Sequence, residues 1–169
     1  FNLQTDGAEY DDIIISDGGM RNKISGNSLQ EIETGKSNFR APIHMKLDGI
    51  RIFNFALREV APNIKALCEA AKKTQDEIDF FVLHQANRLM LESVRKKLGV
   101  EETKVPYSLY DFGNTSSASI PLTMVTNLRD DLMNRKLKLL LSGFGVGLSW
   151  GSVLLETENI FVSPLIEMA

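Results

Sequence analysis

Three short stretches of the sequence carry residue types that could do chemistry. The first is the tetrapeptide His84–Asn87 (HQAN), the second runs from Gly113 to Ser119, and the third from Gly143 to Gly151. An imidazole N–H from His84 and a carboxamide N–H from Asn114 could both donate hydrogen bonds to one oxygen atom. Two preorganised donors of this kind stabilise a developing oxyanion or enolate without any proton transfer.

The elements predicted around these stretches place them at strand ends. Phe80–Leu83 is a short apolar run typical of a buried strand, and it delivers His84 at its C-terminal end. Leu137–Ser142 and Leu148–Glu156 predict two more strands, and the short glycine-rich turn between them makes them antiparallel neighbours. The loops that follow strands are where α/β folds place their functional residues.

Apolar periodicity predicts three helices. The first covers Ile50–Lys73, and Pro62 is expected to kink or divide it because proline removes a helical hydrogen bond. The second covers about Ala86–Leu98 and ends before a glycine. The third covers about Ser117–Asn134. A capping box at Thr74 predicts one further short turn.

Two short extended segments complete the prediction, Ile13–Ile15 and Val105–Leu109, while residues 20–48 have weak periodicity and are expected to be mostly irregular. Strands that alternate with helices predict an α/β fold with a mixed sheet of about five strands layered with helices. The sequence does not explain the partly apolar extension Asn159–Ala169. Its apolar end, which contains Leu165, Ile166 and Met168, could partly cover an exposed apolar surface of the chain.

Composition narrows the class of protein. The chain has 169 residues, enough for one domain with its own core, and a net charge of -3 gives no reason to expect nucleic acid or an anionic membrane as partner. No apolar run approaches the ~20 residues of a membrane-spanning helix. A single cysteine, the absence of a signal-peptide pattern and a start at Phe1 favour part of a longer, cytoplasmic protein.

Together and in this order, the three motifs resemble the C-terminal half of the β-ketoacyl-acyl-carrier-protein synthase III family, in the thiolase-like superfamily. His84 and Asn114 are 30 positions apart, which fits that family, and the resemblance runs from about Leu47 to Thr157. It implies that residues 1–169 form one half of a thiolase-like fold. The resemblance further implies an N-terminal half with a reactive cysteine, and a homodimer.

The implied reaction is a decarboxylative Claisen condensation in fatty-acid biosynthesis. Acyl-CoA and malonyl-acyl-carrier-protein would give 3-oxoacyl-acyl-carrier-protein, CoA and carbon dioxide, with His84 and Asn114 as two members of a Cys-His-Asn triad. Coenzyme A and phosphopantetheine thioesters are then substrates, and no metal or cofactor is expected. His84 should be neutral in this role, so we expect apolar surroundings that lower its pKa.

The resemblance assigns further residues of the site. Val146 matches the position whose N–H serves the second oxyanion, although the family usually has glycine there and a β-branched residue resists positive φ. Arg88 and Arg95, on one side of a helix, would dock the acidic carrier protein, although a solvated helix face explains them equally well. The residues that match contacts to the pantetheine arm are Gly49, Ala86, Asn87 and Phe144.

Each of these residues also has a plain structural interpretation. A lone histidine at a strand end is more often structural than catalytic, and His44 is expected to be structural. Asn114 after Gly113 would ordinarily be a turn residue. The combination of motif and spacing favours catalysis for His84 and Asn114 only.

The sequence argues against four other kinds of site, which are a cysteine nucleophile, a serine nucleophile, a dinucleotide-binding loop and a metal site. Cys68 lies within a predicted helix, where a thiol acts as a small buried hydrophobe. Ser116 and Ser117 lack the G-x-S-x-G surroundings of a nucleophile elbow. The glycine turn lacks the third glycine of a dinucleotide loop, and two histidines and one cysteine lying far apart make no plausible metal site.

Two alternative functions stay open. A relative could use the same triad on another acyl donor or acceptor, for example in secondary metabolism. The chain by itself could also be a binding module that contacts pantetheine or carrier protein without turnover. An upstream segment with a cysteine at a strand-to-helix turn would discriminate between an enzyme and a binding module.

Overall fold

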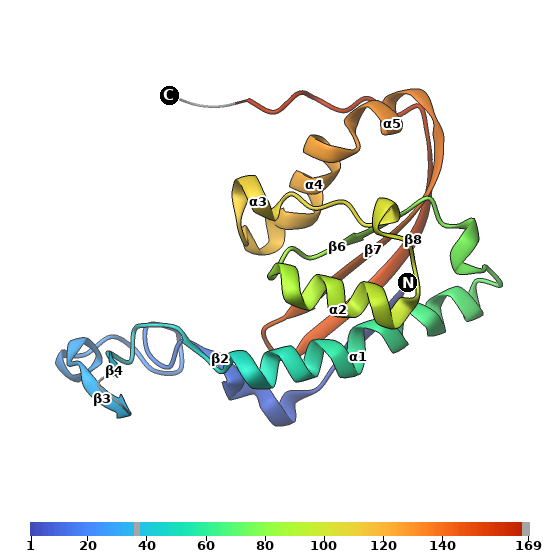
Figure 1. Ribbon diagram of the computed structural model, residues 1–169. Coiled ribbons are helices and arrows are strands. Elements are labelled where there is room, and N and C mark those ends of the chain that lie inside the picture. Colours follow the sequence, from blue (N-terminus) through green and yellow to red (C-terminus); the bar gives the residue numbers. More distant parts are fainter. Residues whose placement is uncertain (36–37, 167–169) are drawn as a thin grey trace.

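A computed structural model of the chain describes residues 1–35 and 38–166, and its centre is a four-stranded sheet with helices on both faces (Figure 1). The strand order is β1-β8-β7-β6. β6 and β7 run parallel, whereas β8 pairs antiparallel with both β7 and β1. The expected mixed α/β sheet is confirmed, with four strands in place of about five. Its strands are β1 (Asn2–Thr5), β6 (Phe80–Leu83), β7 (Lys136–Gly145) and β8 (Ser149–Glu158).

Two helices, α1 (Gly49–Ala70) and α2 (Arg88–Leu98), pack together on one face of the sheet. Phe81 and Leu83 of β6 join the hydrophobic cluster beneath these helices, because alternate residues of a strand point to the same face. The helix boundaries follow local signals. Asn87 caps α2 by accepting a hydrogen bond from the Met90 N–H at 2.8 Å, and Gly99 ends it at a φ of 78°.

The opposite face is covered by α4 (Ser119–Asn127) and α5 (Arg129–Asn134). The sequence predicted one helix here, but Leu128 has φ −120° and ψ 7° and separates two. Leu128 is buried in the second hydrophobic cluster together with Val82 of β6. Burial of this side chain at the sheet accompanies the break between the helices.

Helix α1 is not divided at its proline, although division was one of the two outcomes predicted. Pro62 lies inside a continuous helix of 22 residues, and the helix ends at Ala70 rather than Lys73. Proline costs one backbone hydrogen bond, but the residues on either side, Ala61 and Asn63, are buried against the body of the protein. Tertiary packing therefore holds the helix across the proline.

Residues between the first strand and α1 form an arm that extends away from the body (Figure 1). It contains two short antiparallel pairs, one of β2 (Ile13–Ile14) with β5 (Lys46–Leu47) and one of β3 (Ile32–Gly35) with β4 (Asn38–Arg40). The mostly irregular character predicted for residues 20–48 is confirmed only in part, because short elements cover Gly26–Leu29, Ile32–Gly35, Asn38–Arg40 and Lys46–Leu47. The predicted strand at Ile13 exists, but it pairs within the arm and lies outside the main sheet.

Short helical turns connect the larger elements. Val105–Leu109 forms no strand, and a short helix begins at Leu109 instead. The expected capping box of Thr74 with Glu77 is confirmed. These turns are η1 (Gly7–Asp12), η2 (Gly26–Leu29), η3 (Gln75–Glu77), η4 (Glu102–Lys104), α3 (Leu109–Phe112) and η5 (Ser116–Ala118).

The segment after β8 packs back on α5. The Ile160 N–H donates to the carbonyl of Leu132 at 3.0 Å, and Arg129 donates to the carbonyl of Val162 at 3.1 Å. The proposed contribution of Met168 lies outside the described residues. Across the part of the chain that is described, no helix is long and apolar enough to cross a membrane.

Candidate active site

His84 lies immediately after the C-terminal end of β6. Its backbone N–H donates to the carbonyl of Ser142 in β7 at 2.8 Å, so strand pairing fixes its position. Its Nδ1 lies 2.7 Å from the hydroxyl of Ser119 at the start of α4. The ring of Phe144 packs edge-on against the imidazole, with the centroids 5.3 Å apart. Three elements of the fold therefore hold this one ring.

The surroundings of His84 favour the neutral imidazole. Burial lowers the pKa of His84 below the ordinary value of 6.5, and a backbone hydrogen bond with Ser116 opposes this shift. A histidine with a lowered pKa is neutral near pH 7 and retains one N–H donor. The structure agrees in this respect with the neutral state expected from the sequence.

Asn114 lies in the loop between α3 and α4, after Gly113, which has a φ of 64°. Its side-chain oxygen Oδ1 accepts a hydrogen bond from the Ser116 N–H at 2.9 Å. The carboxamide oxygen is thereby engaged in the loop, and the NH₂ group remains as the donor. Asn114 is exposed and lines the same two pockets as His84.

Val146 lies at the tip of the turn between β7 and β8 and is 65% exposed. Positive φ in this turn falls on Gly147, at 135°, and Val146 has no positive φ. A β-branched residue is therefore tolerated at this position, because the backbone of Val146 does not require positive φ. Leu148, on the other side of the turn, exchanges two backbone hydrogen bonds of 2.9 Å with Asp6.

Two pockets meet at His84, Asn114 and Phe144. The smaller pocket has a volume of about 140 Å³ and the larger about 910 Å³. The smaller one is lined by all the residues that the sequence matched to a pantetheine arm, namely Gly49, Ala86, Asn87 and Phe144. The fold brings these four residues together with the histidine and the asparagine, although they come from four different segments of the chain.

Gly49 is the first residue of α1, where the backbone amides of the first turn have no partner within the helix. The side chain of Asp48 caps this helix instead, because its Oδ1 accepts a hydrogen bond from the Arg51 N–H at 3.0 Å. One of the free amides of the first turn is thus already paired.

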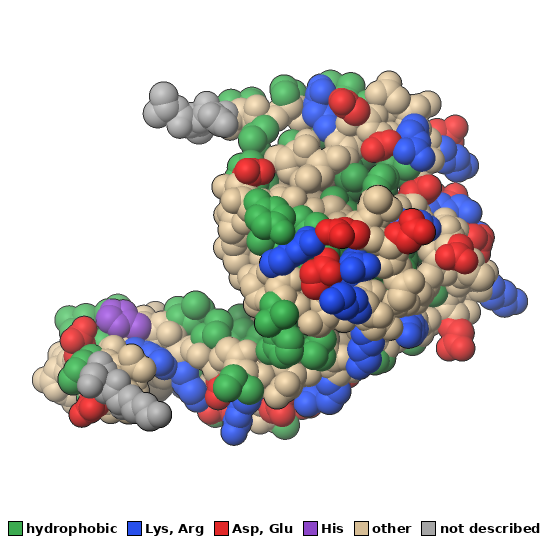
Figure 2. Space-filling view, viewed as in Figure 1, with side chains coloured by type: hydrophobic (Ala, Val, Ile, Leu, Met, Phe, Trp, Pro, Cys, Tyr) green, Lys and Arg blue, Asp and Glu red, His purple; other side chains and the backbone are tan. Residues whose placement is uncertain are grey.

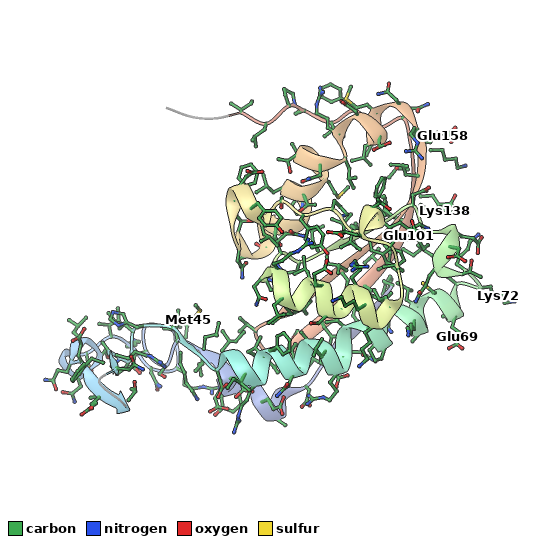
Figure 3. The ribbon with its side chains drawn as sticks, in the orientation of Figure 1. Met45, Glu69, Lys72, Glu101, Lys138 and Glu158 are labelled. Atoms are coloured by element: carbon green, nitrogen blue, oxygen red, sulfur yellow. The ribbon has the colours of Figure 1, made fainter. Side chains whose placement is uncertain are left out.

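The larger pocket is open and largely apolar. Figure 2 shows that the molecule is hollowed between the arm and the body, with hydrophobic side chains gathered where the arm joins. Met45, which is labelled in Figure 3, lies on the arm and lines this pocket. Ile13 and Leu47, which pair in the arm, line both pockets. No motif marked these two residues, and their apolar type was the only signal that the sequence contained.

Arg88 and Arg95 lie on α2 and line neither pocket. Arg88 makes ion pairs with Glu102 at 2.6 Å and Glu92 at 3.3 Å, and its guanidinium stacks 3.8 Å from the ring centre of Tyr107. Arg95 also pairs with Glu92, at 2.8 Å, and its hydrogen bond is the main cause that lowers the pKa of Glu92 to about 2. Both cations are therefore engaged within the chain.

The remaining candidates differ in their position relative to the pockets, and Cys68 and His44 line neither of them. Cys68, the only cysteine of the chain, is a residue of α1 that is buried in the core, and burial raises the pKa of its thiol. His44 accepts a local hydrogen bond from the Ala41 N–H at 3.3 Å. Ser116 and Ser117 line the larger pocket. Within residues 1–35 and 38–166, no group of three His, Cys, Asp or Glu side chains could hold a metal.

Comparison with known proteins gives this geometry a context. The family described as 3-oxoacyl-[acyl-carrier-protein (ACP)] synthase III C terminal matches residues 68–157, more than half of the chain. The chain belongs to this family. Its β-ketoacyl-[acyl-carrier-protein] synthase III relative from Streptococcus gordonii is 44% identical over 113 residues, which cover 66% of this chain and 35% of the relative.

Solved structures of synthases of this family superpose on most of the chain. The 3-oxoacyl-(acyl-carrier protein) synthase of Burkholderia xenovorans gives a TM-score of 0.85 at 36% identity, over 98% of this chain and 46% of that one. The priming β-ketosynthase of the R1128 polyketide pathway gives 0.74 at 28% identity, over 91% and 43%. The chain thus has the thiolase-like fold of these synthases and spans less than half the length of each relative.

Proposed function

We propose that this chain is the C-terminal half of a condensing enzyme that catalyses a decarboxylative Claisen condensation between an acyl thioester and malonyl-acyl-carrier-protein, in fatty-acid biosynthesis. The observation that carries the proposal is that His84 and Asn114 both line the two pockets where these meet, and that the NH₂ group of Asn114 is left to donate. The relatives are named as synthases of this type, which supports the same reaction.

The smaller pocket would receive the pantetheine arm of the malonyl thioester. Cleavage of the bond between the carboxylate and the α-carbon releases carbon dioxide and moves an electron pair toward the thioester oxygen. Nε2–H of His84 and the NH₂ group of Asn114 then donate to that oxygen. Each donor of this kind is worth about 3 kcal/mol in the transition state, or roughly a hundredfold in rate.

The carbanion would then attack an acyl group carried on a cysteine of the other half of the enzyme. A new carbon–carbon bond forms, negative charge moves to the acyl oxygen, and the cysteine thiolate leaves when that oxyanion collapses. We assign the Val146 N–H, at the exposed tip of its turn, as a donor to this second oxyanion. Cys68 is buried away from both pockets and takes no part.

The partners that follow are acyl-CoA, the acyl carrier protein and the N-terminal half, in a cytoplasmic homodimer that needs no metal or cofactor. Gly49, Ala86, Asn87 and Phe144 would contact the pantetheine arm. Arg88 and Arg95 remain the proposed docking residues for the carrier protein. Because both are paired with glutamates, docking would have to exchange these ion pairs for contacts with the acidic carrier.

The test uses the full-length protein, meaning the natural polypeptide that contains this chain. It is supplied with labelled acyl-CoA and malonyl-acyl-carrier-protein, and both carbon dioxide and the 3-oxoacyl product are measured. Equal amounts of the two are expected. A protein that binds the carrier and forms neither would contradict the enzyme and favour a binding module.

A second candidate is a priming synthase of a secondary pathway, and the similarity to the R1128 priming β-ketosynthase supports it. The two candidates share the site residues and differ in the acyl group. A panel of acyl-CoA primers, assayed with the same malonyl carrier, separates them by the chain length that is used best.

A further inference from the structure

Ser119 has a buried hydroxyl whose partner is the candidate catalytic histidine. The residue is 1% exposed, and its Oγ lies 2.7 Å from Nδ1 of His84. A buried hydroxyl needs an acceptor for its proton. Within the described residues, the ring nitrogen Nδ1 of His84 is the partner of the Ser119 hydroxyl. It can accept the hydroxyl proton when it carries no proton itself.

The opposite direction of this hydrogen bond is less favourable. If Nδ1 of His84 donated to the hydroxyl, the proton of Ser119 would be left buried without an acceptor. The backbone contact with Ser116 raises the pKa of His84, but burial is the larger effect and keeps the ring neutral. A neutral ring that accepts at Nδ1 carries its proton on Nε2.

A chain of buried hydrogen bonds holds Ser119 in place. Thr123 uses its only hydroxyl proton to donate to the Ser119 carbonyl at 2.7 Å, so the hydroxyl of Ser108, also 2.7 Å away, must donate to Thr123. The Ser108 N–H in turn donates to the side-chain oxygen of Gln85 at 3.1 Å. Since Gln85 follows His84 directly, both partners of the His84–Ser119 pair are tied to one buried network.

We propose that Ser119 is a positioning residue that donates its hydroxyl proton to Nδ1 of His84 and thereby holds the ring in the Nε2–H tautomer. The inference rests on the proposed function, in which that N–H serves the enolate oxygen. Because Ser119 acts through His84, its loss should affect the turnover step more than the binding of substrate.

The first test is a tautomer measurement that needs no activity. In full-length protein labelled with ¹⁵N-histidine, the His84 signal is assigned by its loss in His84→Gln. At pH 7 it should have the pattern of an unprotonated Nδ1 and a protonated Nε2. A protonated Nδ1 in the wild type overturns the proposal, and this result does not depend on the folding of any Ser119 variant.

The second test compares Ser119→Ala with Ser152→Ala, which removes a hydroxyl that is equally buried and bonds Ser142 at 3.0 Å. Ser119→Ala should yield a mixture of tautomers and lower kcat about 10- to 100-fold with KM little changed, the range typical when the partner that orients a functional histidine is lost. Ser152→Ala should keep the tautomer and kcat.

A single Nε2–H tautomer, or an unchanged kcat, in folded Ser119→Ala contradicts the proposal. An equal loss in Ser152→Ala also contradicts it, because the effect would then come from the loss of any buried hydroxyl. The wild type could also show the Nε2–H tautomer and have no condensing activity. That result would contradict the proposed function, but it would still agree with the hydrogen bond assigned to Ser119.

Discussion

His84 and Asn114 are held to different degrees. The imidazole contacts residues of β7 and α4, whereas Asn114 is exposed in a loop and keeps one described side-chain hydrogen bond, to the Ser116 N–H. A donor to an oxyanion contributes most when its orientation is fixed before the reaction. We therefore expect contacts from the other half of the enzyme to complete the orientation of Asn114.

The first prediction concerns these two donors. In the full-length protein, His84→Ala and Asn114→Ala should each lower malonyl decarboxylation roughly a hundredfold or more, because one oxyanion donor is lost. Acylation of the enzyme should be affected less. Single-turnover assays with labelled acyl-CoA separate the two steps. His44→Ala, which removes the other histidine of the chain, is the matched control, and unchanged condensation in either site variant would reject the assignment.

The second prediction follows from the lowered pKa of His84. Below the ordinary value of 6.5 the unfolded chain binds a proton that the folded protein binds only at lower pH. The stability that His84 contributes is therefore present above pH 6.5 and is lost as pH falls through the lowered pKa. Urea unfolding just below pH 6.5 should show a steeper loss of unfolding free energy with falling pH in the wild type than in His84→Gln.

Cys68 provides the third prediction. Because its thiol is buried in the core and lines neither pocket, Cys68→Ser should leave condensation by the full-length protein nearly intact. The variant should lose stability, about 1–3 kcal/mol if the new hydroxyl finds no partner. Complete loss of acyl transfer by a folded Cys68→Ser protein would mean that Cys68 is the nucleophile.

His84 and Asn114 were predicted from the residue types of their motifs, the spacing between them and the family resemblance. The features that the sequence did not reveal are contacts between side chains that lie far apart in the chain. The four pantetheine candidates were matched through the family resemblance, and in the structure they line one pocket together with His84 and Asn114. The pairing of Arg88 with Glu102, 14 positions away in sequence, was not predictable from helix spacing. The hydroxyl of Ser119 was inside a recognised motif, but only the packing of α4 against β6 gives it a partner.

At the scale of elements, strong local signals predicted boundaries and weak ones did not. The apolar run of β6 and the glycine that ends α2 were found, since each is encoded by adjacent residues, whereas the N-cap Asn87 was not named. β1 was missed because its sequence, NLQT, is mostly polar and exposed. It becomes a strand by pairing with β8, which is remote in sequence. The continuity of α1 at Pro62 is likewise decided by packing.

The fourth prediction tests one such local signal. Gly99 ends α2 with a φ of 78° and has open space around it, so an added methyl group meets no neighbour. Gly99→Ala should still destabilise the protein by about 1 kcal/mol, because a side chain disfavours left-handed backbone. Gly26, which has equally open space and no positive φ, is the control. Equal unfolding free energies for the two alanine variants would contradict this explanation.

For the whole molecule, the larger pocket is open to solvent, and some of the apolar residues that line it are exposed. Leu3 and Val146 both line the larger pocket and remain 67% and 65% exposed. Each 100 Å² of apolar surface left in water costs about 2.5 kcal/mol. An open apolar pocket of about 910 Å³ next to catalytic candidates is thus a surface that a second body would be expected to cover.

The last prediction is that the 169-residue chain alone has no condensing activity and associates through this surface. Its one thiol is buried in the core, so no cysteine of the chain can carry an acyl group beside His84. We expect the isolated chain to self-associate, to bind a hydrophobic dye, or to require the upstream half for stable behaviour. Light scattering and dye binding, with and without the upstream segment, measure this directly. Turnover of acyl-CoA and malonyl-acyl-carrier-protein by a monodisperse monomer of the chain would show that the site is complete without a second half.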